Sequence, residues 1–295
     1  MTEDTTTELR HGYAELDSVR LHYVEAGQGP LVVLLHGFPE FWYGWRAQIG
    51  PLATAGFRVV APDMRGYNLS GKPTRVQSYR IGSLTADVRD LIAERGGADG
   101  AMLVGHDWGG AVAWATAIRH PEAVNRLAIL NVPHPRRMLE GLRTARQLRR
   151  SWYMLFVQLP GVSERLLRAR RFRALRRPFS DARPGSYDEA DIDRYVEAWS
   201  QPGALTAMLN YYRAMLRRPG GTARASGMRP VAAPTLIVWG ERDRHLGGEL
   251  AEPHPADAPN LERVVRIPNA SHWVAQDEPE LVNRLLAEFF VADRR

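Results

Sequence analysis

One carboxylate in this chain stands where a buried strand passes directly into a helix. The segment AMLVGHDWGGAVAW places Asp107 between Gly105 and Gly109. A sharp strand-to-helix turn strains the backbone and needs small neighbours two positions either side of the exposed residue, which is the pattern of a nucleophile elbow. The free N–H groups and the dipole of the following helix favour an ionised carboxylate. Aspartate is also a frequent helix N-cap, so this motif alone leaves a nucleophile and a cap both open.

Two further side chains follow predicted strands in the order that hydrolytic triads use. The run PTLIVWGERD presents Asp243 at the end of an apolar strand, and RIPNASHW places His272 in a loop after the last strand. The chain order nucleophile, acid, histidine is typical of one large class of hydrolases. Glu241 and Asp277 compete for the acid role. We rank them lower because Glu241 lies closer to the strand and Asp277 lies beyond the histidine.

The loop Leu35-His36-Gly37-Phe38-Pro39 follows another predicted strand. In this arrangement the backbone N–H groups of Phe38 and Trp108 are predicted to form an oxyanion hole, which stabilises the charge that develops when an ester is hydrolysed. His36 is expected to brace the loop rather than to act as a base, because a tight turn uses polar side chains to satisfy its backbone.

Short apolar runs without polar alternation alternate with helical patterns, and this rhythm predicts the elements that position these residues. A hairpin is expected at 11–17 and 19–25, and further strands at 30–35, 57–61, 101–104, 127–130, 234–239 and 261–267. Helices are expected at 44–55, 84–95, 109–119 and 279–290. Strands of this kind belong to a mostly parallel sheet covered by helices on both faces, so the fold class is α/β.

The rhythm is interrupted from about residue 134 to 227 by helical patterns rich in arginine. We therefore predict a core domain formed by residues 1–133 and 228–295 and an inserted helical cap, residues 134–227. Residues 136–177 hold thirteen arginines and two glutamates. Because Lys72 is the only lysine, arginine is interpreted as the general solubilising cation, and neither nucleic acid nor a membrane is expected as a partner.

Composition excludes several classes of protein. The 295 residues carry a formal charge of +6, 44% are hydrophobic and none is cysteine, so disulfides, thiolate nucleophiles and cysteine-bound metals are ruled out. The N-terminal run MTEDTTTELR is polar where a signal peptide requires an apolar stretch, and no apolar run approaches the ~20 residues that span a bilayer. The expected location is the cytoplasm.

Taken together, these motifs resemble those of the epoxide hydrolases with the α/β-hydrolase fold, over nearly the whole chain. The matching segments are HGFPEFWYGW, PDMRGYNLSGKP, GHDWGGAVAW, NVPHP, PTLIVWGERD and NASHW. In the insertion, SWYMLFVQLPGVSE and LNYYRAM resemble the cap segments that supply two ring-opening tyrosines, which implies Tyr153 and Tyr212. Tyr212 is preferred over Tyr211 on this resemblance alone. One departure is Asn68, where the family usually has glycine; asparagine tolerates positive φ, so the turn should survive.

The resemblance implies a reaction that suits a carboxylate nucleophile. Asp107 would open an apolar epoxide to an enzyme ester, Tyr153 and Tyr212 would protonate the leaving oxygen, and His272, oriented by Asp243, would activate the water that releases a diol. Trp108 and Trp273 are expected to line the substrate site with both tyrosines. The mechanism requires no metal and no organic cofactor. The chain is expected to be a monomer or a homodimer.

Two alternatives remain open at this stage. A haloalkane dehalogenase also uses an aspartate elbow followed by tryptophan, but that family commonly has asparagine at the position of Phe38 or a second tryptophan in the cap. Fluoroacetate-type dehalogenation is disfavoured because Trp108 and Ala111 replace the arginines that bind carboxylate there. The other alternative is a non-catalytic protein of the same fold that binds a small ligand in the pocket.

Overall fold

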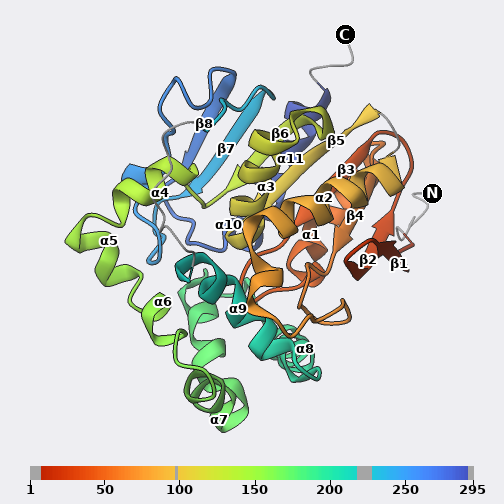
Figure 1. Ribbon diagram of the computed structural model, residues 1–295. Helices are drawn as coiled ribbons and strands as arrows, with labels where there is room; N and C mark the ends of the chain where they lie inside the picture. Colours follow the sequence, from red (N-terminus) through yellow and green to blue (C-terminus); the bar gives the residue numbers. More distant parts are fainter. Residues whose placement is uncertain (1–7, 97–98, 218–227, 292–295) are drawn as a thin grey trace.

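An eight-stranded sheet organises the computed structural model, which describes residues 8–96, 99–217 and 228–291. The strand order is β1-β2-β4-β3-β5-β6-β7-β8 (Figure 1). The strands are β1 (Arg10–Leu16), β2 (Val19–Ala26), β3 (Leu31–Leu35), β4 (Arg58–Pro62), β5 (Ala101–His106), β6 (Val124–Leu130), β7 (Thr235–Gly240) and β8 (Leu261–Ile267). All eight expected strands are present, which confirms the α/β fold class.

The pairs β1–β2 and β2–β4 are antiparallel, and the other pairs in this sheet are parallel. The central strands β3 and β5 are apolar and buried along their whole length, because helices cover both of their faces. Their carboxyl ends meet at one edge, where Leu35 pairs in register with Gly105. The loops that follow β3 and β5 are therefore neighbours at that edge.

Alternate strand residues pack against different helices. On one face, Val33 and Leu103 join the cluster formed with α2 (Ile81–Gly96) and α3 (Trp108–Arg119). On the other face, Val32 and Val104 join the cluster formed with α1 (Arg46–Thr54) and α11 (Pro279–Val291). This alternation is the period-two pattern of a strand buried on both sides. A one-turn helix, η1 (Trp42–Trp45), precedes α1, and α10 (Val274–Asp277) precedes α11.

The described residues between β6 and β7 form helices and no strand, and we call the segment from residue 135 to 216 the cap. Its helices are α4 (Pro135–Gly141), α5 (Ala145–Arg150), α6 (Tyr153–Phe156), α7 (Val162–Arg176), η5 (Arg177–Asp181), α8 (Glu189–Ser200) and α9 (Ala204–Leu216). In Figure 1, α4 and α5 lie to the left of the sheet, and α6, α7, α8 and α9 lie below it, with α7 lowest. The predicted cap boundaries at 134 and 227 stay a prediction, and residue 227 lies outside the described residues.

Short helices and turns connect the remaining elements: η2 (Val76–Tyr79), η4 (Pro121–Ala123) and η6 (Gly248–Leu250). Asn68 adopts φ of 39°, so asparagine holds the positive-φ turn as expected. Its side-chain amide donates to Asp63 at 2.8 Å, which stabilises this conformation. Within the described ranges, the structure contains no helix that is both apolar enough and long enough to cross a bilayer.

Candidate active site

Asp107 occupies the single residue between the end of β5 and the start of α3. Its backbone has φ of 50° and ψ of −121°, a conformation that costs energy for a residue with a side chain. The carboxylate makes no cap hydrogen bond to α3. It instead accepts a hydrogen bond of 2.7 Å from the Phe38 N–H, in the loop after β3. The N-cap alternative is thereby excluded, and the carboxylate is turned away from its own helix.

Glycines allow the loop after β3 to approach the turn between β5 and α3 closely. A Cβ on Gly109 would lie 2.1 Å from the backbone oxygen of Leu35, and a Cβ on Gly37 would lie 2.4 Å from the Cβ of Asp107. Neither position leaves room for a side chain, and the atom in the way at Gly109 belongs to the backbone. The packing of the β3 loop against the β5–α3 turn thus depends on both glycines and sets the position of the Phe38 N–H beside Asp107.

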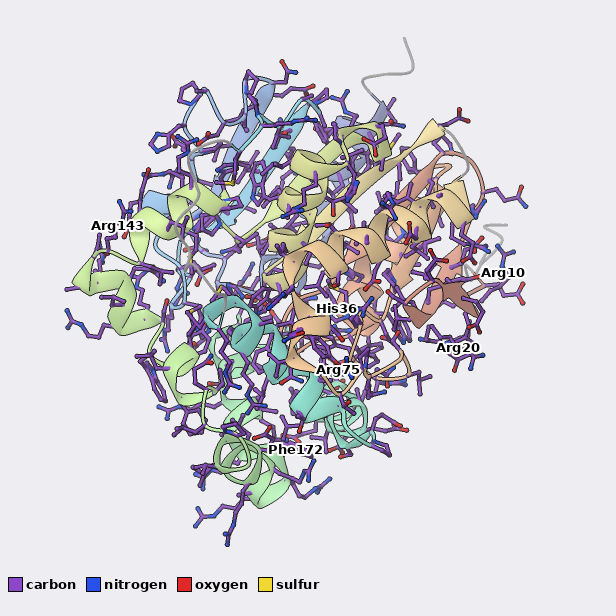
Figure 2. The ribbon with its side chains drawn as sticks, viewed as in Figure 1. Arg10, Arg20, His36, Arg75, Arg143 and Phe172 are labelled. Carbon is purple, nitrogen blue, oxygen red and sulfur yellow. The ribbon has the colours of Figure 1, made fainter. Side chains whose placement is uncertain are left out.

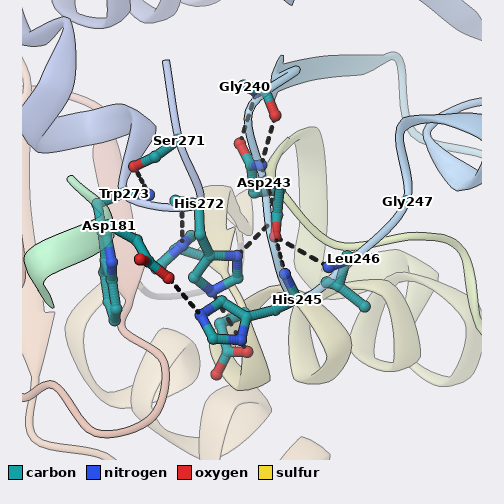
Figure 3. A network of polar contacts seen from close by, with 12 residues as sticks. Asp181, Gly240, Asp243, His245, Leu246, Gly247, Ser271, His272 and Trp273 are labelled. Carbon is teal, nitrogen blue, oxygen red and sulfur yellow. Dashed lines mark hydrogen bonds and ion pairs between the residues drawn. The ribbon is translucent and has the colours of Figure 1, made fainter. Parts of the chain in front are cut away.

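The two other triad candidates lie with Asp107 at the same edge of the sheet. Figure 3 shows His272 beside Asp243. His272 Nδ1 lies 2.8 Å from Asp243 Oδ2, and His272 Nε2 lies 3.7 Å from Asp107 Oδ2. The imidazole therefore stands between two carboxylates, hydrogen-bonded to one and facing the other. The second oxygen of Asp243 accepts the backbone N–H groups of His245 at 2.7 Å and Leu246 at 2.9 Å, which fixes its orientation.

The charges of these three groups depend on one another. Burial raises the pKa of Asp107, but the proximity of His272 outweighs burial and the net pKa lies below its ordinary value. Burial also opposes ionisation of Asp243, yet the charge of His272 lowers its pKa to about 2. For His272, burial lowers the pKa, whereas Asp243 and Asp107 raise it to about 10. At neutral pH the site thus holds an imidazolium between two carboxylates.

Asn131 is a site residue that the sequence did not single out. It directly follows β6, adopts φ of 46° and donates its side-chain amide to Asp243 Oδ2 at 2.8 Å. The same side chain accepts the Gly240 N–H at 2.9 Å, which ties the loop bearing Asp243 to the end of β6. An asparagine just after a buried strand, at the sheet edge that carries the triad, is the signal that could have found it.

His106 and Glu40 form a second buried pair beneath His272. His106 Nε2 lies 2.9 Å from the His272 backbone oxygen, and His106 Nδ1 lies 3.0 Å from Glu40 Oε2. The cap reaches the same carboxylate, since the hydroxyls of Tyr187 and Tyr195 contact Glu40 Oε1 at 3.5 and 3.4 Å. This pair supports the backbone of the histidine loop and joins it to the cap. The sequence offered no spacing that linked residues 40, 106 and 272.

The competing acids have other partners. Glu241 lies 3.7 Å from Arg266 at the surface. Asp277 accepts hydrogen bonds from both the backbone and the hydroxyl of Ser271, at 2.7 and 2.6 Å, and it also accepts the Arg183 N–H of the cap at 2.8 Å. Both are separated from the imidazole of His272, which pairs with Asp243.

His36 braces its loop. Its Nε2 accepts the Met64 N–H at 2.9 Å, and its Nδ1 donates to the Gly37 carbonyl at 3.0 Å. Figure 2 shows it in the interior of the molecule. Both ring nitrogens are thus used by the backbone, and the expectation that His36 is structural agrees with these contacts.

A cavity of about 1570 Å³ lies between the triad and the cap. Its lining includes Phe38, Asp107, Tyr153, Tyr212, His272 and Trp273. Burial raises the pKa of Tyr153, and it raises that of Tyr212 well above the ordinary value; the charge of Asp107 adds to both effects. Both phenols therefore remain protonated at neutral pH and can donate hydrogen bonds into the cavity.

The structure separates the two adjacent tyrosines of α9. The Tyr211 hydroxyl donates to the Arg65 carbonyl at 2.8 Å in the interior, whereas Tyr212 lines the cavity. Trp108 is not part of the lining; its ring packs perpendicular to that of Tyr212 at 5.1 Å between centroids. The contribution of the Trp108 N–H to an oxyanion hole stays a prediction. In the described part of the chain, no group of three or more His, Asp or Glu side chains is arranged to hold a metal ion.

Comparison with known proteins finds similarity to the α/β hydrolase family and to epoxide hydrolases within it. A family profile described as alpha/beta hydrolase fold matches residues 30–279. The AB hydrolase superfamily protein YfhM of Bacillus subtilis is 43% identical over 282 residues, which cover 94% of this chain and 96% of that protein. Epoxide hydrolase 3 of Xenopus tropicalis is 39% identical, and the match covers 96% of this chain and 78% of that protein.

Solved structures agree with these relatives. The crystal structure of a Bacillus megaterium epoxide hydrolase in complex with an inhibitor has a TM-score of 0.86 and 34% identity, and covers 95% of this chain and 99% of that one. A variant of that enzyme, complexed with its product (R)-3-(1-naphthyloxy)propane-1,2-diol, has the same TM-score with 33% identity over 95% of this chain and 99% of that one.

Proposed function

Because this chain belongs to the epoxide hydrolases of the α/β hydrolase fold, we propose that it converts an apolar epoxide to a vicinal diol through an ester of Asp107. The observation that carries the proposal is the composition of the lining of one cavity. An ionised carboxylate and two protonated phenols, those of Tyr153 and Tyr212, line the same cavity. Opening an epoxide requires a nucleophile at carbon and an acid at oxygen, and this cavity contains both.

The two oxygens of Asp107 are already distinguished before substrate binds. Oδ1 accepts the Phe38 N–H, while Oδ2 faces His272. We assign the attack on the epoxide carbon to Oδ2. A C–O bond then forms at Oδ2, the ring C–O bond breaks, and the released alkoxide takes a proton from Tyr153 or Tyr212. Oδ1 becomes the carbonyl oxygen of the ester and keeps the Phe38 N–H as its donor.

Formation of the ester changes the charge around His272. Asp107 loses its negative charge, so one of the two carboxylates that hold the imidazolium no longer raises the pKa of His272. The imidazolium can then release its proton, which restores the phenol. The neutral ring accepts a proton from water as that water attacks Cγ of Asp107, and the developing oxyanion lies on Oδ1, beside the Phe38 N–H.

Collapse of this tetrahedral species completes the cycle. The Cγ–Oδ2 bond breaks as His272 returns its proton to Oδ2, and the diol leaves with that oxygen. The remaining proton of the attacking water passes from the new carboxylic acid to Nε2 of His272, so Asp107 is again a carboxylate beside a protonated His272. The net reaction is epoxide plus water to diol, and both atoms and charge balance. Asp243 keeps its hydrogen bond to Nδ1 throughout, so the ring retains the orientation in which Nε2 faces Asp107.

A single-turnover reaction in heavy-oxygen water tests this proposal. Excess enzyme is mixed with the 1-naphthyl glycidyl ether, the epoxide that corresponds to the diol bound by the Bacillus megaterium variant. The expected diol is unlabelled, and the peptide that contains Asp107 gains the label. Incubation with preformed diol is the control for exchange without turnover. Label in the first-turnover diol, with none in the peptide, would contradict an ester intermediate.

The same preparation separates the alternatives. Halide release from bromoalkanes without diol formation would indicate a dehalogenase. Thermal stabilisation by the naphthyl compounds without any turnover would indicate a ligand-binding protein. Neither result is expected, because the phenols face the cavity and all three triad groups are present and in contact.

A further inference from the structure

The outer surface of the cap carries apolar side chains that the fold leaves exposed. The six most exposed large apolar residues among those described all fall within nineteen consecutive positions: Leu148, Trp152, Leu155, Leu159, Val162 and Leu166, at 51 to 70% exposure. Four of them lie on α5, α6 and α7, and Trp152 and Leu159 lie in the turns between these helices. In Figure 1 these helices lie along the left and lower left of the molecule, away from the sheet.

Arginines surround these apolar residues. Arg143, Arg149, Arg165 and Arg168 are exposed, and within the described ranges no ion pair joins any of them to a carboxylate. Figure 2 shows Arg143 at the outer edge of the molecule. The nearby Glu164 is bound to Arg213 at 2.7 Å and does not neutralise the surface. We call these apolar residues and arginines together the cap patch.

The catalytic cavity opens on this patch. Trp152 and Leu166 are 64 and 55% exposed, yet both line the cavity that also contains Asp107 and His272. Arg146, Arg149 and Arg150 belong to the lining as well. The cavity therefore runs from the nucleophile to an outer rim of tryptophan, leucine and arginine. An apolar compound that enters from this rim can contact tryptophan and leucine side chains on its way to the nucleophile.

We propose that the cap patch docks on an anionic lipid surface and that the catalytic cavity receives its epoxide from that surface. Exposed tryptophan and leucine beside arginine is the composition of segments that lie in the interfacial layer of a bilayer, with apolar side chains inserted and guanidinium groups at the phosphates. The supply of substrate rests on the proposed function, whereas the docking does not. This proposal revises the expectation that the arginines serve only to keep the chain soluble.

Other occupants fit the patch less well. A nucleic acid would pair with the arginines, but the aliphatic side chains of Leu155, Leu159 and Val162 have no role in such a contact. A second copy of the chain would cover the leucines, but a symmetric contact would bring the unpaired arginines of both copies together without carboxylates between them. A lipid surface accepts the apolar and the cationic residues at once.

Vesicle co-sedimentation tests the proposal with the full chain and no epoxide. Vesicles of phosphatidylcholine with about 30 mol% phosphatidylglycerol are compared with vesicles of phosphatidylcholine alone. We expect binding to the anionic vesicles at least about tenfold stronger, and weakened in about 1 M salt, where the Debye length is about 3 Å. Because no substrate is present, this outcome is independent of whether the chain hydrolyses epoxides.

Paired variants locate the surface. Leu155→Ser with Leu159→Ser removes apolar contacts, and Arg143→Glu with Arg165→Glu reverses charge; each pair should lower binding about tenfold or more. Leu69→Ser and Arg75→Glu are the matched controls, since both residues are exposed outside the cap. Melting temperatures verify that every variant is folded. Equal binding to both vesicle types, wild-type binding by both patch pairs, or a dimer that the leucine pair converts to a monomer would overturn the proposal.

Discussion

The two walls of the catalytic cavity are built differently. On the sheet side, both carboxylates are fixed by backbone N–H groups: Asp107 by that of Phe38, and Asp243 by those of His245 and Leu246. On the cap side, Tyr153 of α6 and Tyr212 of α9 pack against one another with rings 5.7 Å apart. In the proposed reaction the sheet thus supplies a nucleophile with fixed geometry, whereas the acid depends on how the cap is placed.

The largest effect is expected at Asp107. Asp107→Asn should lower diol formation by about 10⁴-fold or more. Asp181 also lines the cavity, but its carboxylate is paired with Arg244 at 2.6 Å and is not expected to take over the attack. The fold should survive, since an asparagine oxygen can still accept the Phe38 N–H. Product chromatography and thermal melting measure the two properties. Turnover within tenfold of wild type would remove Asp107 from the mechanism.

His272→Gln should block the second half-reaction and leave the first. Alkylation needs only the carboxylate and the phenols, so the variant should accumulate a covalent adduct while steady-state turnover falls by about 10³ to 10⁴-fold. Intact mass spectrometry after substrate addition detects the adduct, and Asp107→Asn is the negative control. Unmodified protein after prolonged incubation would show that the ester does not form or does not require this base.

Changes on the cap side should be graded rather than complete. Tyr153→Phe and Tyr212→Phe should each slow ester formation by about 10 to 100-fold, and the double variant should nearly stop it, because one phenol can still donate when the other is absent. Tyr211→Phe is the matched control, since its hydroxyl binds Arg65 in the interior. Rapid-quench measurement of adduct formation provides the readout. If neither single change alters it, the phenols have been assigned wrongly.

A change at Asn131 tests whether its side chain orients Asp243. Asn131→Gly keeps the positive-φ turn but removes the donor to Asp243, and it should lower kcat by about tenfold, an effect typical of a partner that orients a charged group. Asn68→Gly is the control, because Asn68 also has positive φ but lies apart from the triad. A wild-type pH profile and kcat for Asn131→Gly would show that the backbone N–H groups suffice to hold Asp243.

The smallest expected effect is on stability. The pKa of His272 is raised in the folded state to about 10 from an ordinary 6.5, so its ion pairs stabilise the fold fully below pH 6.5 and this contribution is lost as pH rises through 10. The melting temperature of the wild type should therefore fall by a few degrees more between pH 6.5 and 10 than that of His272→Gln. Parallel curves for the two proteins would contradict the raised pKa.

Much of the fold and the triad could be predicted because they depend on local patterns. Apolar runs located the strands from β3 to β8, a hairpin pattern located β1 and β2, and the chain order of Asp107, Asp243 and His272 placed them at one sheet edge. Helix ends were less accurate: α2 begins at Ile81 rather than at residue 84, because the Leu84 N–H already donates to the Arg80 carbonyl at 3.2 Å.

The remaining site residues could not be predicted because their partners are distant in the chain. Asn131 pairs with Asp243 across 112 positions, and His106 meets the His272 backbone across 166. No spacing rule links such residues before the sheet order is known. Tyr212 was preferred over Tyr211 on the family resemblance alone, and the orientation of α9 supplies the physical reason. The exposed leucines of the cap are indistinguishable in sequence from buried ones, so the arginines beside them were interpreted as ordinary solvated residues.

The glycines around the elbow limit how such an enzyme can diverge. Positions 37 and 109 admit no side chain, because backbone or the nucleophile itself occupies the space. Position 107 is different: its side chain projects toward the cavity, and its strained backbone is set by the surrounding loops rather than by the carboxylate. New chemistry on this scaffold is therefore more accessible through replacement of the nucleophile or the cap than through any change in the residues that encircle the turn.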